Sequence, residues 1–407
     1  MKCGLLGRKL GHSYSPQIHA LLGNYSYQLF EKEPEEIGDF LKNGDFTGLN
    51  VTIPYKKEVI PFLDELSPAA ARLGAVNTIV RRDGKLIGHN TDYFGFRRLV
   101  QESGLQVAGK KVLVLGSGGA SSTAVAVLQE LGAKVTIISR SGENNYENLE
   151  RHADAAVIAN TTPVGMYPNT GKSALSLEGF PRLEGVLDAV YNPARTQILL
   201  DAERRGLAAV NGLWMLVAQA KESAEWFTGE EIPDSRIAKI HHTLRLQMEN
   251  IILIGMPGCG KTAVGQQLAQ KLGKKFVDAD ESLEARVCRK ITDIIPNDGE
   301  AAFREMESET LAELGKQSGL VIATGGGCVT QPQNYPLLHQ NGTIFWLKRE
   351  LDKLPTDGRP LSQKGTLGQM YEARMPLYRR FADAAISNDG SITETASAIC
   401  RKLEETT

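Results

Sequence analysis

The stretch LIGMPGCGKTAVG, residues 253–265, lies between an apolar run and an amphipathic one. Within it, residues 255–262 match G-x-x-x-x-G-K-[ST], the phosphate-binding loop that joins a strand to a helix. Its glycines let backbone N–H groups converge on phosphate oxygens, and the helix N-terminus adds a partial positive charge. In this pattern Lys261 reaches the β- and γ-phosphates and Thr262 holds Mg²⁺. We therefore expect an ATP site formed by Gly258, Cys259, Gly260, Lys261, Thr262 and Ala263.

A second glycine-rich turn lies earlier in the chain, in LVLGSGGASSTAV, residues 113–125. A strand-like run precedes this turn and a helix-like run follows it, which favours dinucleotide binding. An ordinary tight turn is the alternative, because Ser121 stands where a third spaced glycine is expected. The cofactor contacts expected from the turn come from Gly116, Ser117, Gly118, Gly119 and Ala120.

The end of the next predicted strand suggests which dinucleotide binds. An NAD site has an acidic residue there for the ribose 2′-hydroxyl, but this chain has Ser139 and Arg140. A guanidinium group suits a 2′-phosphate, so we expect NADP(H) rather than NAD. A solvated surface arginine is the alternative for Arg140, and the nearby Glu143 would weaken a phosphate site.

Composition indicates a globular protein with more than one domain. The chain has 407 residues, 42% of them hydrophobic and 23% charged, with a formal net charge of −2. Nothing in this balance attracts nucleic acid or an anionic membrane, and no apolar stretch approaches the roughly 18 residues of a membrane helix. The five cysteines form no CxxC pair, which argues against a disulfide framework and a zinc ribbon. With no signal peptide, we expect a cytoplasmic protein; a homo-oligomer is compatible with the sequence.

Apolar strand-like runs alternate with amphipathic helical runs, which is the pattern of α/β architecture. Asp83-Gly84 suits the two-residue turn of a hairpin over residues 77–90. Val264, Leu268 and Leu272 recur every four residues, which predicts one apolar stripe on the helix after the phosphate loop. Strands are expected at 2–7, 26–30, 48–53, 112–116, 134–139, 155–160 and 185–190, and helices at 35–43, 65–74, 122–132, 213–227 and 297–314.

Several polar residues after the phosphate loop could hold a phosphoryl acceptor. Asp278 and Asp280 are two residues apart, so on an extended segment both side chains would point the same way. Gly325, Gly326 and Gly327 follow an apolar strand, and α/β proteins bind ligands at strand ends. Arg304, Arg359 and Arg374 supply cations further along the chain.

Taken together and in this order, these motifs resemble shikimate kinase over residues 250 to about 385. The resemblance implies that Asp280, Arg304, Arg374 and residues Gly325–Gly327 hold shikimate, and two arginines can clamp a carboxylate by bidentate hydrogen bonds. Asp280 would also accept the proton of the attacking hydroxyl. Asp278 would help Thr262 place Mg²⁺, and Arg359 would come from a lid and neutralise charge on the transferred group. The segment over 347–365 is short for the lid of this family.

The first 240 residues carry GHSYSPQIH, NVTIPYK, GAVNT, GHNTDYFGF, ANTTPVGM and NGLWMLVAQA in that order. These blocks are similar to shikimate dehydrogenase, which implies NADPH-linked reduction of 3-dehydroshikimate. The resemblance assigns Lys56 and Asp92 as the acid–base pair. It assigns the substrate contacts to Ser13, Ser15, Thr52, Asn77, Asp92, Tyr191 and Gln219, and the nicotinamide border to Asn160, Thr161 and Met215.

These residue types suit the chemistry. Hydride addition to a ketone leaves an alkoxide, and an ammonium group at Lys56 can stabilise it and donate a proton. Alone, Lys56 would be interpreted as a surface lysine, but the serine pair and HNTD accompany it. Met215 and Gln219 are four residues apart, so they share one face of the predicted helix.

The resemblances predict the division of the chain. We expect a substrate-binding domain over 1–104 and 213–242, a Rossmann NADP-binding domain over 105–212, a linker over 243–249 and a P-loop kinase domain of the nucleoside-monophosphate-kinase-like α/β type over 250–407. The predicted protein is bifunctional: it makes shikimate with NADPH, then phosphorylates it with Mg²⁺ and ATP. Action on a related hydroxy acid such as quinate, or service as a metabolite sensor, are the alternatives.

Overall fold

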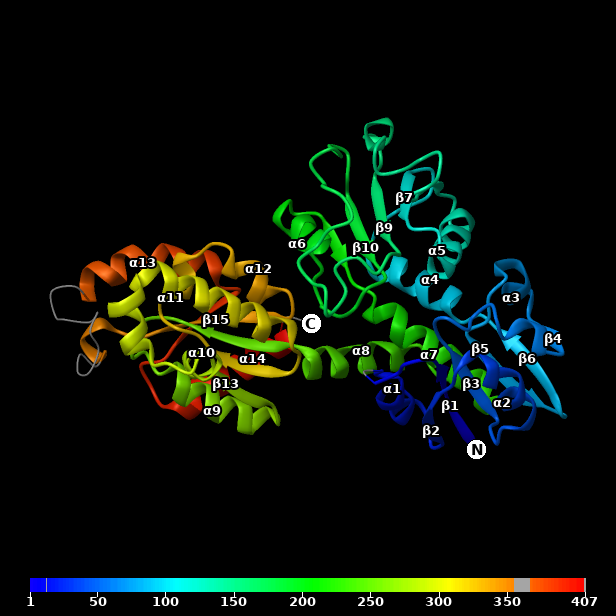
Figure 1. Cartoon of the computed structure of the whole chain (residues 1–407), viewed down its shortest axis with the longest axis horizontal. Helices are drawn as coiled ribbons and strands as arrows, with labels where there is room; N and C mark the ends of the chain where they lie inside the picture. Colours follow the sequence, from blue (N-terminus) through cyan, green and yellow to red (C-terminus); the bar gives the residue numbers. More distant parts are fainter. Residues whose placement is uncertain (12, 355–366, 406–407) are drawn as a thin grey trace. The chain divides into compact units, whose positions relative to one another are not determined.

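The computed structural model describes residues 1–11, 13–354 and 367–405 (Figure 1). The chain divides into two compact units, each described separately below. The first unit contains most of the chain up to His242, and the second contains Thr243–Thr407 together with Met166–Gly171 and Asn192–Gln197. Within the described residues, no helix has both the length and the apolar character needed to cross a bilayer.

The first unit begins with a six-stranded sheet in the order β2-β1-β3-β5-β6-β4. Asp83 and Gly84 connect β5 to β6 with φ values of 50° and 79°, so the predicted hairpin turn is confirmed. The strands are β1 (Lys2–Gly7), β2 (Ser26–Glu31), β3 (Gly48–Val51), β4 (Glu65–Leu66), β5 (Thr78–Arg82) and β6 (Lys85–His89). The helices beside them are α1 (Ser15–Leu22), η1 (Pro34–Glu36), α2 (Ile37–Asn43), η2 (Ile60–Phe62) and α3 (Pro68–Leu73).

One helix prediction in this sheet region started too early. Residues 65–74 were expected to be helical, but Glu65 and Leu66 form β4 and only Pro68–Leu73 is helix. The reason is local: the Ser67 side chain accepts the N–H of Ala70 at 3.3 Å, and Pro68 occupies the first turn. A serine cap followed by proline fixes a helix start at that point.

A five-stranded parallel sheet follows, in the order β11-β10-β9-β7-β8. Among the described residues, its strand order matches the dinucleotide-binding order 3-2-1-4-5-6 with strand 3 absent. In this match β7 takes the place of strand 1 and β8 that of strand 2, so β8 is an edge strand. Helices α4, α5 and α7 pack on one face of this sheet and α6 on the other. The elements are α4 (Asp92–Glu102), β7 (Lys111–Leu115), α5 (Gly119–Glu130), β8 (Lys134–Ile138), η3 (Leu149–His152), β9 (Val157–Asn160), β10 (Gly185–Asp188), α6 (Gln197–Arg204), β11 (Ala208–Val210) and α7 (Leu213–Thr228).

The predicted linker over 243–249 is mostly helical. Helix α8 runs over Ser235–Met248 without a break, and β12 starts two residues after it. Residues up to His242 belong to the first compact unit and those from Thr243 to the second. The separation of the first unit into a substrate-binding and a cofactor domain stays a prediction.

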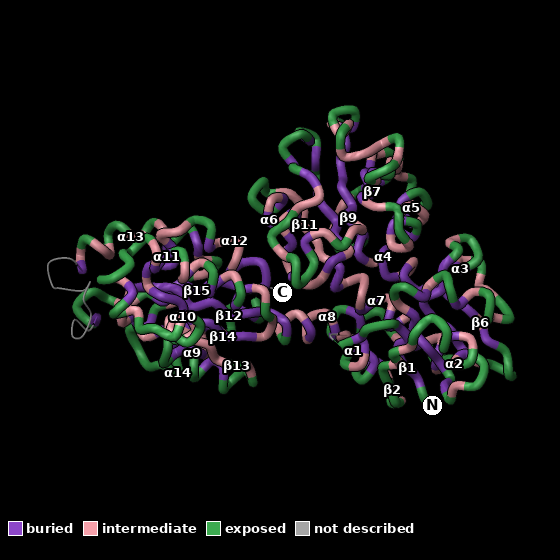
Figure 2. Tube along the Cα trace, in the orientation of Figure 1, coloured by how far each residue is buried: buried purple, intermediate pink, exposed green. Residues whose placement is uncertain are grey.

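The second unit is a five-stranded parallel sheet in the order β13-β14-β12-β15-β16. Figure 2 shows β12, β14 and β15 buried in its centre, and helices cover both faces. The strands are β12 (Asn250–Ile254), β13 (Lys275–Asp278), β14 (Leu320–Ala323), β15 (Gly342–Lys348) and β16 (Ala384–Ser387). The helices are α9 (Lys261–Leu272), α10 (Ala279–Val287), α11 (Ile291–Lys316), η4 (Cys328–Thr330), α12 (Asn334–His339), η5 (Leu351–Lys353), α13 (Leu367–Phe381) and α14 (Ile392–Glu405).

The apolar stripe predicted for α9 is shorter than expected. Val264 and Leu268 are fully buried, whereas Leu272 in the last turn is 37% exposed. Gly273 follows in the left-handed region with φ of 63° and ends the helix. Only the first turns of α9, which directly follow the phosphate loop, therefore pack against the sheet through this stripe.

Candidate functional site

The first unit holds a cavity of about 220 Å³ that gathers the predicted substrate residues. Ser13 precedes α1 and Ser15 begins it, Thr52 directly follows β3, and Gln219 lies on α7. Asn77 precedes β5 and Tyr191 follows β10. Asp92 begins α4, so the side chains predicted to bind a polyhydroxy acid come from six separate segments and line one small cavity. The lining includes Ser13, Ser15, Thr52, Lys56, Asn77, Asp92, Tyr191, Met215 and Gln219.

Lys56 and Asp92 form an ion pair in the wall of this cavity. Nζ of Lys56 lies 2.5 Å from Oδ2 of Asp92, and the side chains are 25% and 11% exposed. Asp92 is the first residue of α4, where the helix dipole favours a carboxylate. The pair is therefore sheltered from bulk water and still open to a ligand in the cavity.

A buried polar network that the sequence analysis missed lies behind the cavity. The Ser223 hydroxyl on α7 contacts the Thr78 and Thr91 hydroxyls at 2.9 Å and accepts the Asn50 amide at 2.7 Å. Asn77 accepts the backbone N–H of Thr91 at 2.7 Å, which fixes the residue before Asp92. Of these residues only Ser223 lies outside the quoted motif blocks, and it is 132 positions from Thr91, so the sequence did not reveal that it joins them.

The cofactor turn between β7 and α5 fits a dinucleotide pyrophosphate. Gly116 has φ of 110°, and a β-carbon there would lie 3.2 Å from Oγ1 of Thr161, so only glycine suits the tight turn. By contrast, a β-carbon at Gly118 or Gly119 would meet nothing within 4 Å. The Ser121 hydroxyl donates to the Gly116 carbonyl at 2.7 Å and holds the turn closed. The open N-terminus of α5 is the kind of surface that binds a phosphate group.

The other predicted cofactor residues lie at the carboxyl ends of neighbouring strands. Ser139 and Arg140 follow β8, and Arg140 is exposed to solvent. Asn160 ends β9 and donates to Asp188 at 2.9 Å, while the Thr161 hydroxyl donates to the Leu115 carbonyl at 2.6 Å. Because β7, β8 and β9 are parallel, these residues share one edge of the sheet with the glycine-rich turn. Their contacts with a cofactor stay predictions.

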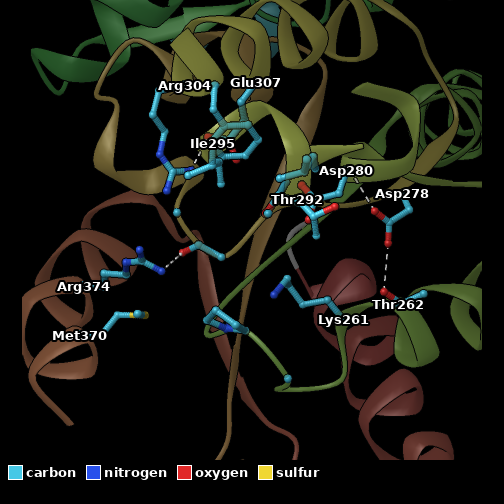
Figure 3. A pocket seen from close by; sticks show the side chains of 18 of the residues that line it. Lys261, Thr262, Asp278, Asp280, Thr292, Ile295, Arg304, Glu307, Met370 and Arg374 are labelled. Atoms are coloured by element: carbon cyan, nitrogen blue, oxygen red, sulfur yellow. Dashed lines mark hydrogen bonds and ion pairs between the residues drawn. The ribbon is translucent and has the colours of Figure 1, made fainter. Parts of the chain in front are cut away.

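The second unit contains a cavity of about 580 Å³ bordered by the phosphate loop (Figure 3). Figure 3 shows Arg304 and Arg374 on one side of the cavity and Lys261 and Thr262 on the other. The predicted residues in its wall are Gly258, Gly260, Lys261, Thr262, Ala263, Asp278, Asp280, Arg304, Gly325, Gly326, Gly327 and Arg374. Cys259 lies outside this wall, because its side chain is fully buried. Arg359 lies outside the described residues.

Thr262 and Asp278 have the donor set that a hard cation takes. The Thr262 hydroxyl and Oδ2 of Asp278 are 3.0 Å apart, so both oxygens face one point. Nζ of Lys261 donates to the carbonyls of Gly255 and Met256 at 3.0 and 3.1 Å, so it lies over the loop that would hold the phosphates. The residues present therefore fit Mg²⁺ and a nucleoside triphosphate.

The expected geometry of the aspartate pair was wrong. Asp278 ends β13 and caps α10, with Oδ1 accepting the N–H of Asp280 at 3.0 Å. Asp280 is thus helical, and the pair does not lie on one extended segment. Both side chains still line the cavity. Burial and the nearby Asp278 carboxylate raise the pKa of Asp280 above its ordinary value.

Arg304 is held by a carboxylate that the sequence analysis did not select. Nη1 of Arg304 lies 2.8 Å from Oε2 of Glu307, and the side chains are 9% and 3% exposed. Glu307 also lines the cavity. The i, i+3 spacing of Arg304 and Glu307 on one predicted helix was a signal that could have found this residue.

The three glycines after β14 let the cavity wall approach its charged residues closely. A β-carbon at Gly327 would lie 2.2 Å from Nη2 of Arg304, and one at Gly325 would lie 2.6 Å from Oε1 of Glu307. The Gly326 carbonyl accepts hydrogen bonds from Arg374 at 3.2 Å and from Tyr378 at 2.5 Å. The glycine segment therefore sets the positions of both arginines.

These two sites define a class of protein: a dinucleotide-dependent oxidoreductase joined to a P-loop phosphotransferase. The shikimate kinase family matches residues 257–404, and the shikimate dehydrogenase substrate binding domain matches residues 5–79. The NADP(+) shikimate dehydrogenase of Clostridium perfringens strain SM101 is 38% identical over 264 residues, which cover 60% of this chain and 97% of the relative.

Solved structures give the same picture. Shikimate dehydrogenase 1 of Peptoclostridium difficile is 38% identical with a TM-score of 0.56, over 60% of this chain and 98% of that one. A chorismate mutase/shikimate 5-dehydrogenase fusion protein of Clostridium acetobutylicum is 36% identical with a TM-score of 0.57, over 60% and 96%. The chain belongs to the shikimate dehydrogenase family and carries a shikimate kinase domain after it, so it is a bifunctional enzyme.

Proposed function

We propose that the first unit reduces 3-dehydroshikimate to shikimate with NADPH, and that the second phosphorylates shikimate to shikimate 3-phosphate with ATP and Mg²⁺. The observation that carries the proposal is that each unit has a cavity whose polar and charged side chains suit the same small hydroxy acid. The first has the Lys56–Asp92 pair among hydroxyl and amide groups, and the second has Arg304 and Arg374 beside Lys261. The product of the first site is the substrate of the second.

In the first cavity the chain supplies binding groups and a proton. Ser13, Ser15, Thr52 and Asn77 offer hydrogen bonds to the carboxylate and hydroxyls of the substrate. NADPH, when bound at the turn between β7 and α5, supplies the hydride. The ammonium of Lys56 stabilises the charge that develops on the carbonyl oxygen and donates the proton. Asp92 orients that ammonium at 2.5 Å and bonds the neighbouring hydroxyl.

In the second cavity the chain positions two anions. Arg304 and Arg374 bind the substrate carboxylate, and Asp280 accepts the proton of the hydroxyl that attacks. A base of raised pKa suits this task, because it takes a proton more readily than an ordinary carboxylate. Lys261 neutralises charge on the ATP phosphates, and Thr262 and Asp278 hold Mg²⁺.

A coupled assay tests the proposal. Purified chain with 3-dehydroshikimate, NADPH, ATP and Mg²⁺ is expected to oxidise NADPH and yield shikimate 3-phosphate, detected by mass spectrometry. Leaving out ATP should stop the reaction at shikimate. If quinate and its dehydro form were turned over with a higher kcat/KM than the shikimate pair, the substrate assignment would be wrong. A quinate dehydrogenase of Corynebacterium glutamicum, 28% identical with a TM-score of 0.55, makes this comparison necessary.

We further propose that the enzyme works in the cytoplasm. Cys3, Cys259 and Cys328 are buried free thiols, which suit a reducing compartment. Fractionation of the cells that make this protein, with blotting for the chain, would test this location.

A further inference from the structure

Arg349 lies just after the end of a sheet strand, beside the phosphate loop. It directly follows β15, which pairs in parallel with β12, the strand that leads into the loop. At the carboxyl end of these strands, a β-carbon at Gly255 would lie 2.6 Å from the Leu347 carbonyl oxygen. Arg349 is therefore next to the loop although it is 88 residues after Lys261 in the sequence.

The contacts of Gly260 place the guanidinium group more closely. A β-carbon at Gly260 would lie 2.6 Å from Nδ2 of Asn388 and 3.8 Å from Nη1 of Arg349. Asn388 connects the phosphate loop to the end of β15. Its side chain donates to the Cys259 carbonyl at 2.6 Å, and its backbone N–H donates to the Lys348 carbonyl at 2.7 Å. The loop, Asn388 and Arg349 thus form one cluster.

Within the described residues the guanidinium of Arg349 makes no hydrogen bond or ion pair, and its Nε is buried without a partner. Its interaction with Asp389 is electrostatic. The Asp389 oxygens bond the Glu350 N–H at 3.0 Å and the Ser387 hydroxyl at 2.7 Å. A half-buried guanidinium without a hydrogen-bonded partner gains free energy from an anion that reaches it.

Arg349 is outside the wall of the cavity in Figure 3, whereas Gly260, its neighbour, is part of that wall. The γ-phosphate of ATP must enter the cavity to reach the substrate hydroxyl near Asp280. The phosphates behind it would then lie along Gly260, on the side where Arg349 is. We propose that Arg349 binds the α- and β-phosphates of ATP, as a second cation besides Lys261. This inference rests on the proposed kinase function.

Steady-state kinetics of the full chain test the assignment. Arg349→Gln is expected to raise the KM for ATP and the Kd for MgADP by roughly tenfold to a hundredfold, the loss typical of a hydrogen bond to a charged group. Arg349→Lys keeps the charge and should lose less than the glutamine variant. The KM for shikimate and the NADPH-linked activity should stay within twofold of the wild-type values.

Arg401→Gln is the matched control, because Arg401 is an exposed arginine on α14. It should leave every constant unchanged. If Arg349→Gln bound MgADP as tightly as the wild type, or lowered only the melting temperature, Arg349 would be structural and the inference would be wrong. Failure of the proposed function would look different, because the wild-type chain itself would then show no shikimate-dependent use of ATP.

Discussion

At the scale of single residues, the pair Arg304–Glu307 explains how a buried guanidinium in the wall of the second cavity is kept in place. Both side chains are less than a tenth exposed, and burying a charge without a partner is costly. Oε2 of Glu307 takes one edge of the guanidinium, and Glu300 takes Nη2 at 3.1 Å. Gly327 lies against the same guanidinium, so any side chain at position 327 would collide with Arg304. We therefore expect Glu307 to act as a positioning residue for Arg304.

Glu307→Gln keeps the shape of this side chain and removes its charge. The KM for shikimate should rise roughly tenfold, because a neutral partner gives Arg304 a weaker hydrogen bond. The KM for ATP should not change, because Glu307 is on the side of the cavity away from Lys261 in Figure 3. Steady-state kinetics with shikimate and ATP varied in turn would measure the two KM values separately. Glu309→Gln is the control, since Glu309 is 59% exposed and pairs with Arg286 on the surface. An equal rise in both KM values would contradict the positioning role.

At the scale of secondary-structure elements, helix α1 docks through a fully buried histidine. The ring of His19 stacks on Tyr27 of β2 at 4.0 Å and on Phe227 of α7 at 5.7 Å. Its Nδ1 lies 2.7 Å from the Tyr25 hydroxyl, and its Nε2 is buried with no partner among the described residues. Burial lowers the pKa of His19 to about 3, because the charged ring would lose its hydration. The contact that carries Ser15 into the first cavity thus requires a neutral imidazole.

The first unit should therefore lose stability in acid. The pKa of His19 is about 3 when folded and about 6.5 when unfolded, so the unfolded chain binds the proton first as the pH falls. Stability is full above pH 6.5 and declines toward pH 3, by roughly 2–3 kcal/mol at pH 4.5 from this group alone. Burial also lowers the pKa of His89, to about 4, so part of the decline belongs to that residue.

Urea unfolding at several pH values would measure this decline. A Trp346→Phe background leaves Trp214 and Trp226 of the first unit as the fluorescent reporters. His19→Phe should lessen the decline of the unfolding free energy between pH 7 and 4.5, whatever it does to stability at neutral pH, and His89 should account for part of what remains. An unchanged slope would show that His19 is not the group that takes up the proton.

Elements with strong local signals could be predicted from the sequence, and those set by distant contacts could not. Local signals depend on residues next to one another in the sequence. Predictions of this kind that the structure confirms are the strand–loop–helix unit around residues 255–262, the Asp83-Gly84 hairpin and the strands at 2–7 and 134–139. Asp278 was placed on an extended segment because the sequence did not reveal that its carboxylate caps α10. Helix α11 was expected from residue 297, but it begins at Ile291 and continues past a break at Gly299, whose φ is 89°. The role of Ser223 on α7 could not be predicted, because its partners Asn50, Thr78 and Thr91 lie far from it in the sequence.

At the scale of the whole molecule, each compact unit has hydrophobic core clusters of its own among the described residues. The largest core of the second unit is built around β12, β14 and β15, whereas the cores of the first unit are built around its two sheets. Each cavity is lined only by residues of its own unit. The family motifs made both cavities predictable, because each motif is a short block at a strand end. Arg349 was not predictable in this way, because only the pairing of β12 with β15 brings it to the loop.

Independent cavities predict that the two activities can be removed one at a time. Lys56→Ala should lower NADPH-linked reduction by roughly a hundredfold to ten-thousandfold, the usual contribution of a general acid, and leave shikimate-dependent ATP use unchanged. Lys261→Ala should do the reverse, since its ammonium bonds only the phosphate loop in the described residues. Both rates would be measured on the same purified sample, so that each activity reports the folding of the chain when the other is lost. A folded single variant that lost both activities would mean that the two sites depend on one another, and the assignment of one reaction to each unit would have to be abandoned.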